Sequence, residues 1–176
     1  TDTETLDLLE AAKDQVFVAP GIAILYAMLH EAEPFGITHQ MAVDMGYQDE
    51  WDHAIESLKA MHKRGIRVLP GGDYGFAFTP HCQNARDLEF FVKYLGMTPL
   101  EAIRSTAEFG GPVMKMPHDL GLIKPGYLAD LLLVDGDPLA NLSILRDPRR
   151  ILAVMKDGQF AKLPPVASER RFERAA

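Results

Sequence analysis

An acidic residue between glycines is the part of this sequence best suited to chemistry. The stretch Arg67-Val68-Leu69-Pro70-Gly71-Gly72-Asp73-Tyr74-Gly75 follows Ile66, and its apolar residues predict a short buried strand. Its glycines let the backbone turn sharply around Asp73. Enzymes with α/β folds place their reactive groups on such loops, at the carboxyl ends of strands. Asp also commonly stabilises its own turn through its side chain, so this stretch alone leaves both roles open for Asp73.

A second group of motifs lies toward the carboxyl end of the chain. Residues 121–135 follow the pattern G-x-I-x-P-G-x-x-A-D-L-x-x-x-D, and a V-x-x-x-G pattern comes later at residues 154–158. A Thr-Pro-x-Glu-Ala-Ile segment that continues to a further threonine precedes them at residues 98–106. Together with Gly71-Gly72-Asp73, this order of motifs resembles the carboxyl-terminal part of the metal-dependent amidohydrolase superfamily, in its imidazolonepropionase and prolidase-like branch.

The resemblance implies an α/β fold in which the chain forms part of a larger architecture. Members of the superfamily fold as a TIM (β/α)8 barrel with a β-sandwich built from both chain ends. By that order of elements, residues 1–117 correspond to the last two β/α units of the barrel. Residues 118–165 correspond to a small C-terminal β-sandwich segment, and residues 166–176 to a solvated tail.

The resemblance also implies a metal-dependent hydrolase that cleaves a C–N bond of a small amide or cyclic amide. Family sites hold one or two divalent metals, usually zinc, which activate water and polarise the scissile carbonyl. The last ligand is an aspartate at the end of barrel strand eight, a position that falls on Asp73 here, and this aspartate also transfers protons. On the same loop, Tyr74, Phe76 and His81 are candidate substrate-binding residues, although a structural role fits His81 equally well.

The other family ligands do not occur in this sequence. None of its histidines forms the His-x-His pair that the family has on strand one, and His53 and His62 fall on a helix expected outside the barrel. One carboxylate does not hold a catalytic zinc, which needs about three protein ligands. We therefore expect the chain alone to be inactive, and to associate with a partner chain that carries strands one to six or with further copies of itself.

Composition excludes several other classes of protein. The 176 residues are 47% hydrophobic and 24% charged, as in ordinary soluble globular domains. The net charge of −7, without a basic stripe, argues against nucleic acid as a partner. No apolar run is long enough for a membrane span and no signal peptide is evident, so we expect a cytoplasmic protein. The single cysteine, Cys82, excludes an intramolecular disulfide and is better explained as a structural residue than as a nucleophile.

The first half of the chain predicts alternating helices and strands. Thr1 and Glu4 fit a capping box that starts a helix to about Lys13. Residues 15–19 predict a strand buried on both faces, as in a parallel sheet, and residues 49–64 predict an amphipathic helix before the Asp73 strand. The connection between them carries helices at 22–32 and 38–45 and is long enough to serve as a lid or wall over a pocket. His30 and His39 lie on this connection, where each is more simply explained as a surface or capping residue than as a substrate contact.

The second half changes from helical to strand periodicity. A helix is predicted at 84–94, and a second capping box of Thr98 and Glu101 opens another helix to about Phe109. Apolar runs at 131–134 and 151–155 predict strands, and Asp157-Gly158 predicts a hairpin turn.

Two other functions compete with hydrolysis. The chain can be a non-catalytic assembly or scaffold module derived from an amidohydrolase barrel, in which Asp73 is only a turn residue and an apolar face binds another copy. A flavodoxin-like or other open α/β binding domain is the weaker alternative, because no glycine-rich phosphate loop follows any strand.

Overall fold

Helices make up most of the computed structural model, which describes residues 1–164. In chain order the helices and strands are α1 (Thr3–Ala11), α2 (Ile22–His30), η1 (Glu33–Phe35), α3 (His39–Asp44), α4 (Tyr47–Lys63), α5 (Arg86–Phe90), η2 (Phe91–Leu95), α6 (Pro99–Ala107), α7 (Gly110–Val113), β1 (Leu131–Val134), η3 (Leu142–Arg146), β2 (Ile151–Lys156) and β3 (Gln159–Lys162). The fold is thus α/β with one small antiparallel sheet.

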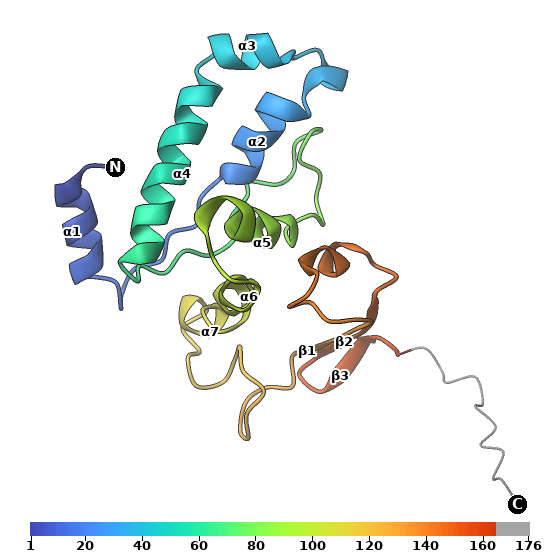
Figure 1. The fold of residues 1–176 in the computed structure, drawn as a ribbon. Helices are drawn as coiled ribbons and strands as arrows, with labels where there is room; N and C mark the ends of the chain where they lie inside the picture. The colour runs from blue at the N-terminus through green and yellow to red at the C-terminus, as the bar shows by residue number, and fades with distance from the viewer. Residues whose placement is uncertain (165–176) are drawn as a thin grey trace, which may run out of the picture.

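The elements form a helical part and a small sheet beside it (Figure 1). Helices α2, α3 and α4 contact one another, and α1 lies along α4. Helices α5, α6 and α7 follow through the middle of the molecule, and the sheet β1–β2–β3 lies on their far side (Figure 1). None of the helices within residues 1–164 has the length and apolar character needed to cross a membrane.

The first helix is capped by a different residue from the one we predicted. Asp2, and not Thr1, is the N-cap of α1, and its carboxylate accepts a hydrogen bond from the Thr5 amide at 2.7 Å. The sequence contains two overlapping capping patterns, and Asp is at least as good an N-cap as Thr. The amino group of Thr1 instead donates to Ser57 Oγ on α4 at 2.9 Å, so it joins α1 to the neighbouring helix.

The two predicted parallel strands meet at a single bridge. Val18 pairs with Val68 in the parallel sense, as expected, through hydrogen bonds from Val18 N to Arg67 O and from Leu69 N to Val18 O, both 2.9 Å. Val68 is buried, but Val16, Phe17 and Val18 are only half-buried. The prediction that residues 15–19 are buried on both faces is therefore wrong for the described part of the chain, which covers each face of this strand only in part.

The main core lies between this strand pair and the helices packed on it. Helix α4 begins at Tyr47, two residues before the predicted start, and buries Trp51, Leu58 and Met61. It ends before Gly65, whose φ of 73° suits a helix stop. Helix α2 packs on α4 and on α5, so the long connection is an integral layer of the fold.

The helix predicted at 84–94 is shorter and less regular than expected. It begins at Arg86, and after Phe90 it continues as a π-helical turn, η2, to Leu95. A π turn shifts the helical phase, and Phe91 at its start is one of the most deeply buried side chains. Cys82 lies before this helix, in an exposed turn.

The carboxyl-terminal elements match their predicted positions closely. Strands β1 and β2 are antiparallel, with Leu132 opposite Val154, and β2 turns into β3 at Asp157-Gly158. Both turn residues have positive φ, 48° and 75°, as a hairpin of this length requires. The predicted tail at 166–176 lies outside the described residues.

The capping box at the start of α6 provides a test of local stability. Thr98 Oγ1 accepts from the Glu101 amide at 3.2 Å, and Glu101 accepts from the Thr98 amide at 2.7 Å. Thr98→Ala should lower the free energy of unfolding by about 1 kcal/mol, because it leaves the Glu101 amide without its cap. Denaturant unfolding measures this change.

The matched control is Thr106→Ala, which removes an exposed threonine from the last turn of the same helix, where its hydroxyl donates to the Ile103 carbonyl at 2.7 Å. Its effect should be neutral or slightly stabilising, since Ala has the higher helix propensity. Equal losses in the two variants would contradict a specific role for the Thr98 cap.

Candidate functional site

The parallel pair of strands brings two loops to one edge. Pro20-Gly21 follows the first strand, and Pro70-Gly71-Gly72-Asp73 follows the second. A Cβ atom placed on Gly21 would lie 3.8 Å from the Asp73 Cβ, so Asp73 sits beside the start of α2. This is the carboxyl edge of both strands, where sequence analysis placed the site.

Asp73 itself is exposed and has a left-handed backbone, with φ of 55°. Such a conformation is uncommon for residues other than Gly, Asn and Asp, and it needs support from the surrounding structure. Some of that support comes from Thr79, which is fully buried and donates its hydroxyl to the Asp73 carbonyl at 3.3 Å. The amide of Gly75 in turn donates to the Thr79 carbonyl at 2.7 Å, which closes a tight turn after Asp73.

Asp87, which no sequence motif singled out, makes two hydrogen bonds to this loop. Its carboxylate is 0% exposed and accepts hydrogen bonds from the Gly71 amide at 3.0 Å and from the Tyr74 hydroxyl at 2.7 Å. Burial raises the pKa of Asp87 above its usual 3.8, while Tyr74 and the amides of Gly71 and Gly72 act in the opposite direction. The only sequence signal was an acidic residue in the first turn of a helix, which does not point to a loop 16 residues away.

Tyr74 points its hydroxyl at Asp87. The phenol is half-buried, and burial followed by the hydrogen bond to Asp87 raises its pKa well above the usual 10. Tyr74 is therefore a neutral hydrogen-bond donor within the loop. Its predicted contact with substrate is a separate matter and stays a prediction.

His81 and Phe76, the other two candidates, are exposed on the same loop. The imidazole of His81 lies beside Gly75, at 3.3 to 3.4 Å from the position that a Cβ would take there. Phe76 stacks on Phe78, with ring centroids 5.8 Å apart, and the Phe35 ring of η1 meets Phe78 at 6.1 Å. The loop thus presents a carboxylate, an imidazole and aromatic rings to solvent, while Tyr74 faces inward.

The described residues do not form a metal site by themselves. No three His, Cys, Asp or Glu side chains within residues 1–164 are grouped so as to hold a metal ion. His30 and His39 stack on each other, with centroids 5.9 Å apart, at the junction of α2 and α3. The metal-ligand role of Asp73 therefore stays a prediction, and residues 1–164 do not group further ligands around it.

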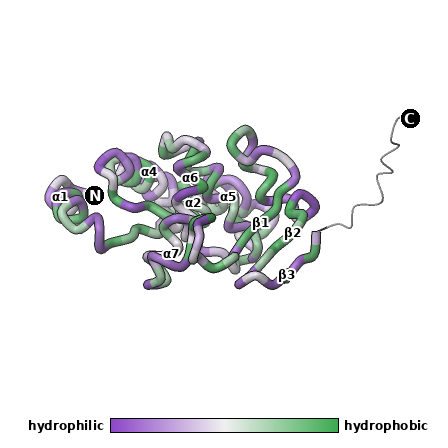
Figure 2. Tube along the Cα trace, turned by 90° about the horizontal axis from the view of Figure 1, so that it is seen from below, coloured by the Kyte–Doolittle hydropathy of each residue, from purple (hydrophilic) through white to green (hydrophobic). Residues whose placement is uncertain are grey.

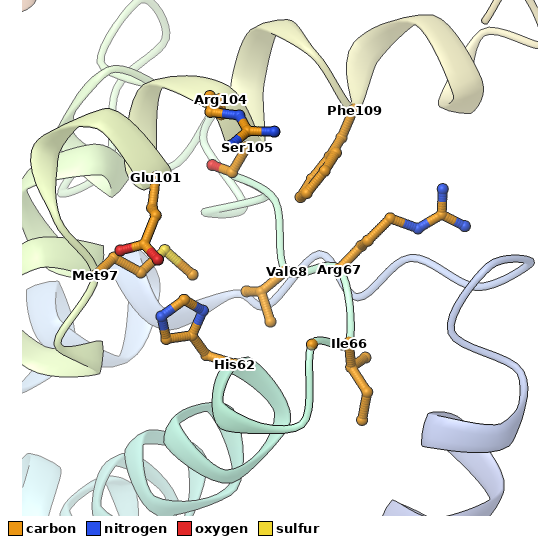
Figure 3. Close-up of a pocket in the computed structure, with 10 residues that line it drawn as sticks. His62, Ile66, Arg67, Val68, Met97, Glu101, Arg104, Ser105 and Phe109 are labelled. Atoms are coloured by element: carbon orange, nitrogen blue, oxygen red, sulfur yellow. The ribbon is translucent and has the colours of Figure 1, made fainter.

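A cavity of about 260 Å³ lies at the opposite end of the Asp73 strand (Figure 3). Figure 3 shows His62 at the end of α4 directed toward Glu101 of α6, with Val68 beside the pair. Glu101 already accepts from Thr98 in the capping box, and Arg104 pairs with Glu108. Two of the charged side chains that line this cavity, Glu101 and Arg104, are thus already paired within the fold.

Close packing at Gly72 yields a first prediction for the site. A Cβ on Gly72 would lie 2.6 Å from Asp87 Oδ1 and 2.8 Å from the Ala23 Cβ. Gly72→Ala should therefore destabilise the fold by about 1–3 kcal/mol, as overpacking of a closed site does. Gly110→Ala is the control, because nothing lies within 4 Å of its Cβ position, and should be neutral or stabilising in denaturant unfolding. Tolerance of Gly72→Ala would contradict the close packing.

The raised pKa of Asp87 yields a second prediction. The folded protein binds the proton of the Asp87 carboxyl more tightly than the unfolded chain does, so the protonated carboxyl adds to the free energy of unfolding. This contribution is complete below about pH 3.8 and is lost as the pH rises through the raised pKa. The side chain introduced by Asp87→Asn does not ionise, so the free energy of unfolding of this variant should fall less as the pH rises. Free energies of unfolding measured between about pH 4 and 7 test this, with Glu89→Gln on the same helix as the control that retains the decline. An unchanged pH slope in Asp87→Asn would contradict it.

Two curated proteins are similar in sequence to more than half of this chain. The chain is 29% identical to the ochratoxinase of Aspergillus niger over 117 residues, which cover 65% of this chain and 23% of the relative. It is 24% identical to the imidazolonepropionase of Vibrio vulnificus over 106 residues, 60% of this chain and 26% of the relative. The chain thus spans about a quarter of the length of these curated relatives.

Solved structures match a larger part of the chain. A putative prolidase from Bifidobacterium longum superposes with a TM-score of 0.79 at 22% identity, over 93% of this chain and 40% of that one. The A. niger ochratoxinase structure gives a TM-score of 0.74 at 23% identity, over 94% of this chain and 36% of that one. At 22% and 23% identity, these superpositions show that the chain shares the fold of the matching part of each solved structure.

The sequence profile described as "Amidohydrolase family" matches residues 4–161, which include every element that surrounds Asp73. The family inferred from the motifs is thus confirmed by a match over most of the chain: this protein belongs to the amidohydrolase family.

Proposed function

We propose that this chain supplies the last two β/α units, the strand-eight aspartate and the C-terminal β segment of an enzyme that hydrolyses a C–N bond in a small amide. The observation that carries the proposal is the placement of Asp73. It is exposed where two parallel strands end at the same edge, on a loop held by hydrogen bonds to Asp87 and Thr79. Family membership supports a hydrolytic reaction at this edge.

The free edge of the Asp73 strand supports the proposal that further strands complete a barrel. Val68 points its amide and carbonyl away from the Val18 strand, and neither has a hydrogen-bond partner within residues 1–164. The cavity of Figure 3 lies beside Val68, and another cavity of about 260 Å³ lies next to Leu69 and Pro70, toward α7. Unpaired strand edges of this kind bind another strand.

In the proposed reaction Asp73 is one metal ligand and the proton carrier. A divalent metal, for which zinc is the expected ion, would lower the pKa of water and polarise the carbonyl. The other ligands would come from protein outside the described residues, since about three are needed. The Asp73 carboxylate takes a proton from water as the oxygen adds to the carbonyl carbon, and it returns that proton to the nitrogen as the C–N bond breaks. The products are a carboxylic acid and an amine.

His81 and Phe76 are the proposed substrate contacts on this loop. The imidazole can donate to a substrate carbonyl or carboxylate, and the exposed Phe76 ring can contact an apolar group. Tyr74 would contribute less directly, because its hydroxyl is already bonded to Asp87.

A non-catalytic assembly module is the second candidate, and one observation favours it. Strand β1 exposes Leu132 and Leu133, at 62% and 52%, and Figure 2 shows apolar residues along β1 and β2. An exposed apolar surface of this kind commonly marks an interface. If another copy of the chain covers it, Asp73 has no ligand partners and the assembly binds no metal.

Metal content and turnover of the native protein that contains this chain test the two candidates. The hydrolase proposal expects about one zinc or more per chain by elemental analysis, in a particle of barrel size, with hydrolysis of simple dipeptides or N-acyl amino acids. Asp73→Asn should lower kcat by at least about 100-fold while circular dichroism and particle size stay unchanged.

Asp119→Asn is the matched control, because Asp119 is also exposed and carries no side-chain hydrogen bond among the described residues. It should leave kcat unchanged. Near-normal turnover in Asp73→Asn would remove the catalytic role, and a metal-free, self-associated particle would favour the assembly module.

A further inference from the structure

We infer that Asp87 is a positioning residue that clamps the loop on both sides of Asp73 and so fixes the direction of the Asp73 carboxylate. The clamp is a feature of the described residues alone. Its consequence for turnover rests on the proposed function of Asp73.

The clamp consists of two hydrogen bonds from one carboxylate. Oδ2 of Asp87 accepts from the Gly71 amide at 3.0 Å, two residues before Asp73, and Oδ1 accepts from the Tyr74 hydroxyl at 2.7 Å, one residue after it. Gly72 lies between these points with no room for a Cβ against the carboxylate. The backbone from 71 to 74 is therefore held at its ends and packed at its middle.

A simple helix cap does not explain this arrangement. Asp87 lies in the first turn of α5, but both of its oxygens bond to the loop, and the N-cap residue Ala85 makes no side-chain cap. The buried carboxylate thus stabilises the loop and not its own helix. A buried charge is costly unless it is hydrogen-bonded, so the loop and Asp87 depend on each other.

The base of the clamp is itself anchored. The neighbouring Arg86 is buried and pairs with Glu31 through both guanidinium NH groups, one of them at 2.8 Å. Its guanidinium also lies over the rings of Tyr26 and Phe90, at 5.1 and 4.9 Å from their centroids. These contacts fix the start of α5 against α2, so Asp87 has a rigid support from which to hold the loop.

Precise placement of a reactive carboxylate needs this kind of support. A catalytic group must be held within a fraction of an ångström by neighbours that are themselves fixed. Asp73 is exposed and has a left-handed backbone, and its own side chain accepts no hydrogen bond within residues 1–164. Its direction is therefore set by the backbone on either side, which Asp87 holds.

Hydrogen exchange on the chain 1–176 tests the clamp without requiring activity. In Asp87→Asn the amide group places a donor against the Gly71 amide or the Tyr74 hydroxyl, so amide exchange within residues 71–75 should rise at least about tenfold. Tyr74→Phe removes one of the two bonds and should give a smaller rise. Exchange in α4 should not change in either variant.

Glu89→Gln is the matched control, since Glu89 lies on the same helix and contacts Arg146, away from the loop. It should exchange like the natural chain. Unchanged loop exchange in Asp87→Asn would overturn the clamp. If circular dichroism shows that Asp87→Asn does not fold, Tyr74→Phe decides the matter on the same criterion.

Kinetics of the native holoenzyme then separate positioning from mere stability. Asp87→Asn should lower kcat by about 10- to 100-fold with KM changed by less than about threefold, because a displaced carboxylate impairs the reaction more than binding. Suppose that Asp73→Asn inactivates the enzyme and that Asp87→Asn has faster loop exchange. A normal kcat in Asp87→Asn would then overturn the positioning role of Asp87. If Asp73→Asn is itself active, the proposed function fails, and hydrogen exchange still decides whether the clamp exists.

Discussion

The parallel pairing of Val18 with Val68 is the constraint on which the rest of the structure depends. Two hydrogen bonds align the strands so that both end at the same edge, and this brings Gly21 next to Asp73. The buried side chain of Val68 joins the strand pair to the core formed by the helices. The pairing thus places α2 beside the Asp73 loop, although the two are about 50 residues apart in sequence.

Elements determined by local sequence were predicted well, and elements determined by distant contacts were not. The capping box of Thr98 and the turn at Asp157-Gly158 depend on residues within a few positions of each other, and both formed as predicted. At Thr1 two local patterns overlapped, and the stronger cap, Asp2, prevailed. The π turn after Phe90 changes the helical phase, and a search for a single helical period does not reveal it.

The candidate site shows the same division. The glycines around Asp73 are a local signal, so its loop and its position at the strand end were predictable. The partner of the loop, Asp87, lies on another element, and its role follows only once α5 packs beside the strand pair. Tyr74 illustrates the point: it was predicted to contact substrate, and no local pattern connected its hydroxyl with the buried Asp87 carboxylate to which it donates.

The structure separates two requirements that a metal hydrolase must meet. The described residues can meet the first requirement, the positioning of Asp73. Asp87 and Thr79 hydrogen-bond to its loop, and Gly72 is closely packed within it. Assembly of the ligand set is not met there, since one carboxylate does not hold a metal. If the free edge beside Val68 binds the remaining strands, those strands would meet an aspartate that is already fixed. Less conformational entropy would then be lost when the site forms, because the Asp73 loop is ordered by the fold of this chain before any metal is bound.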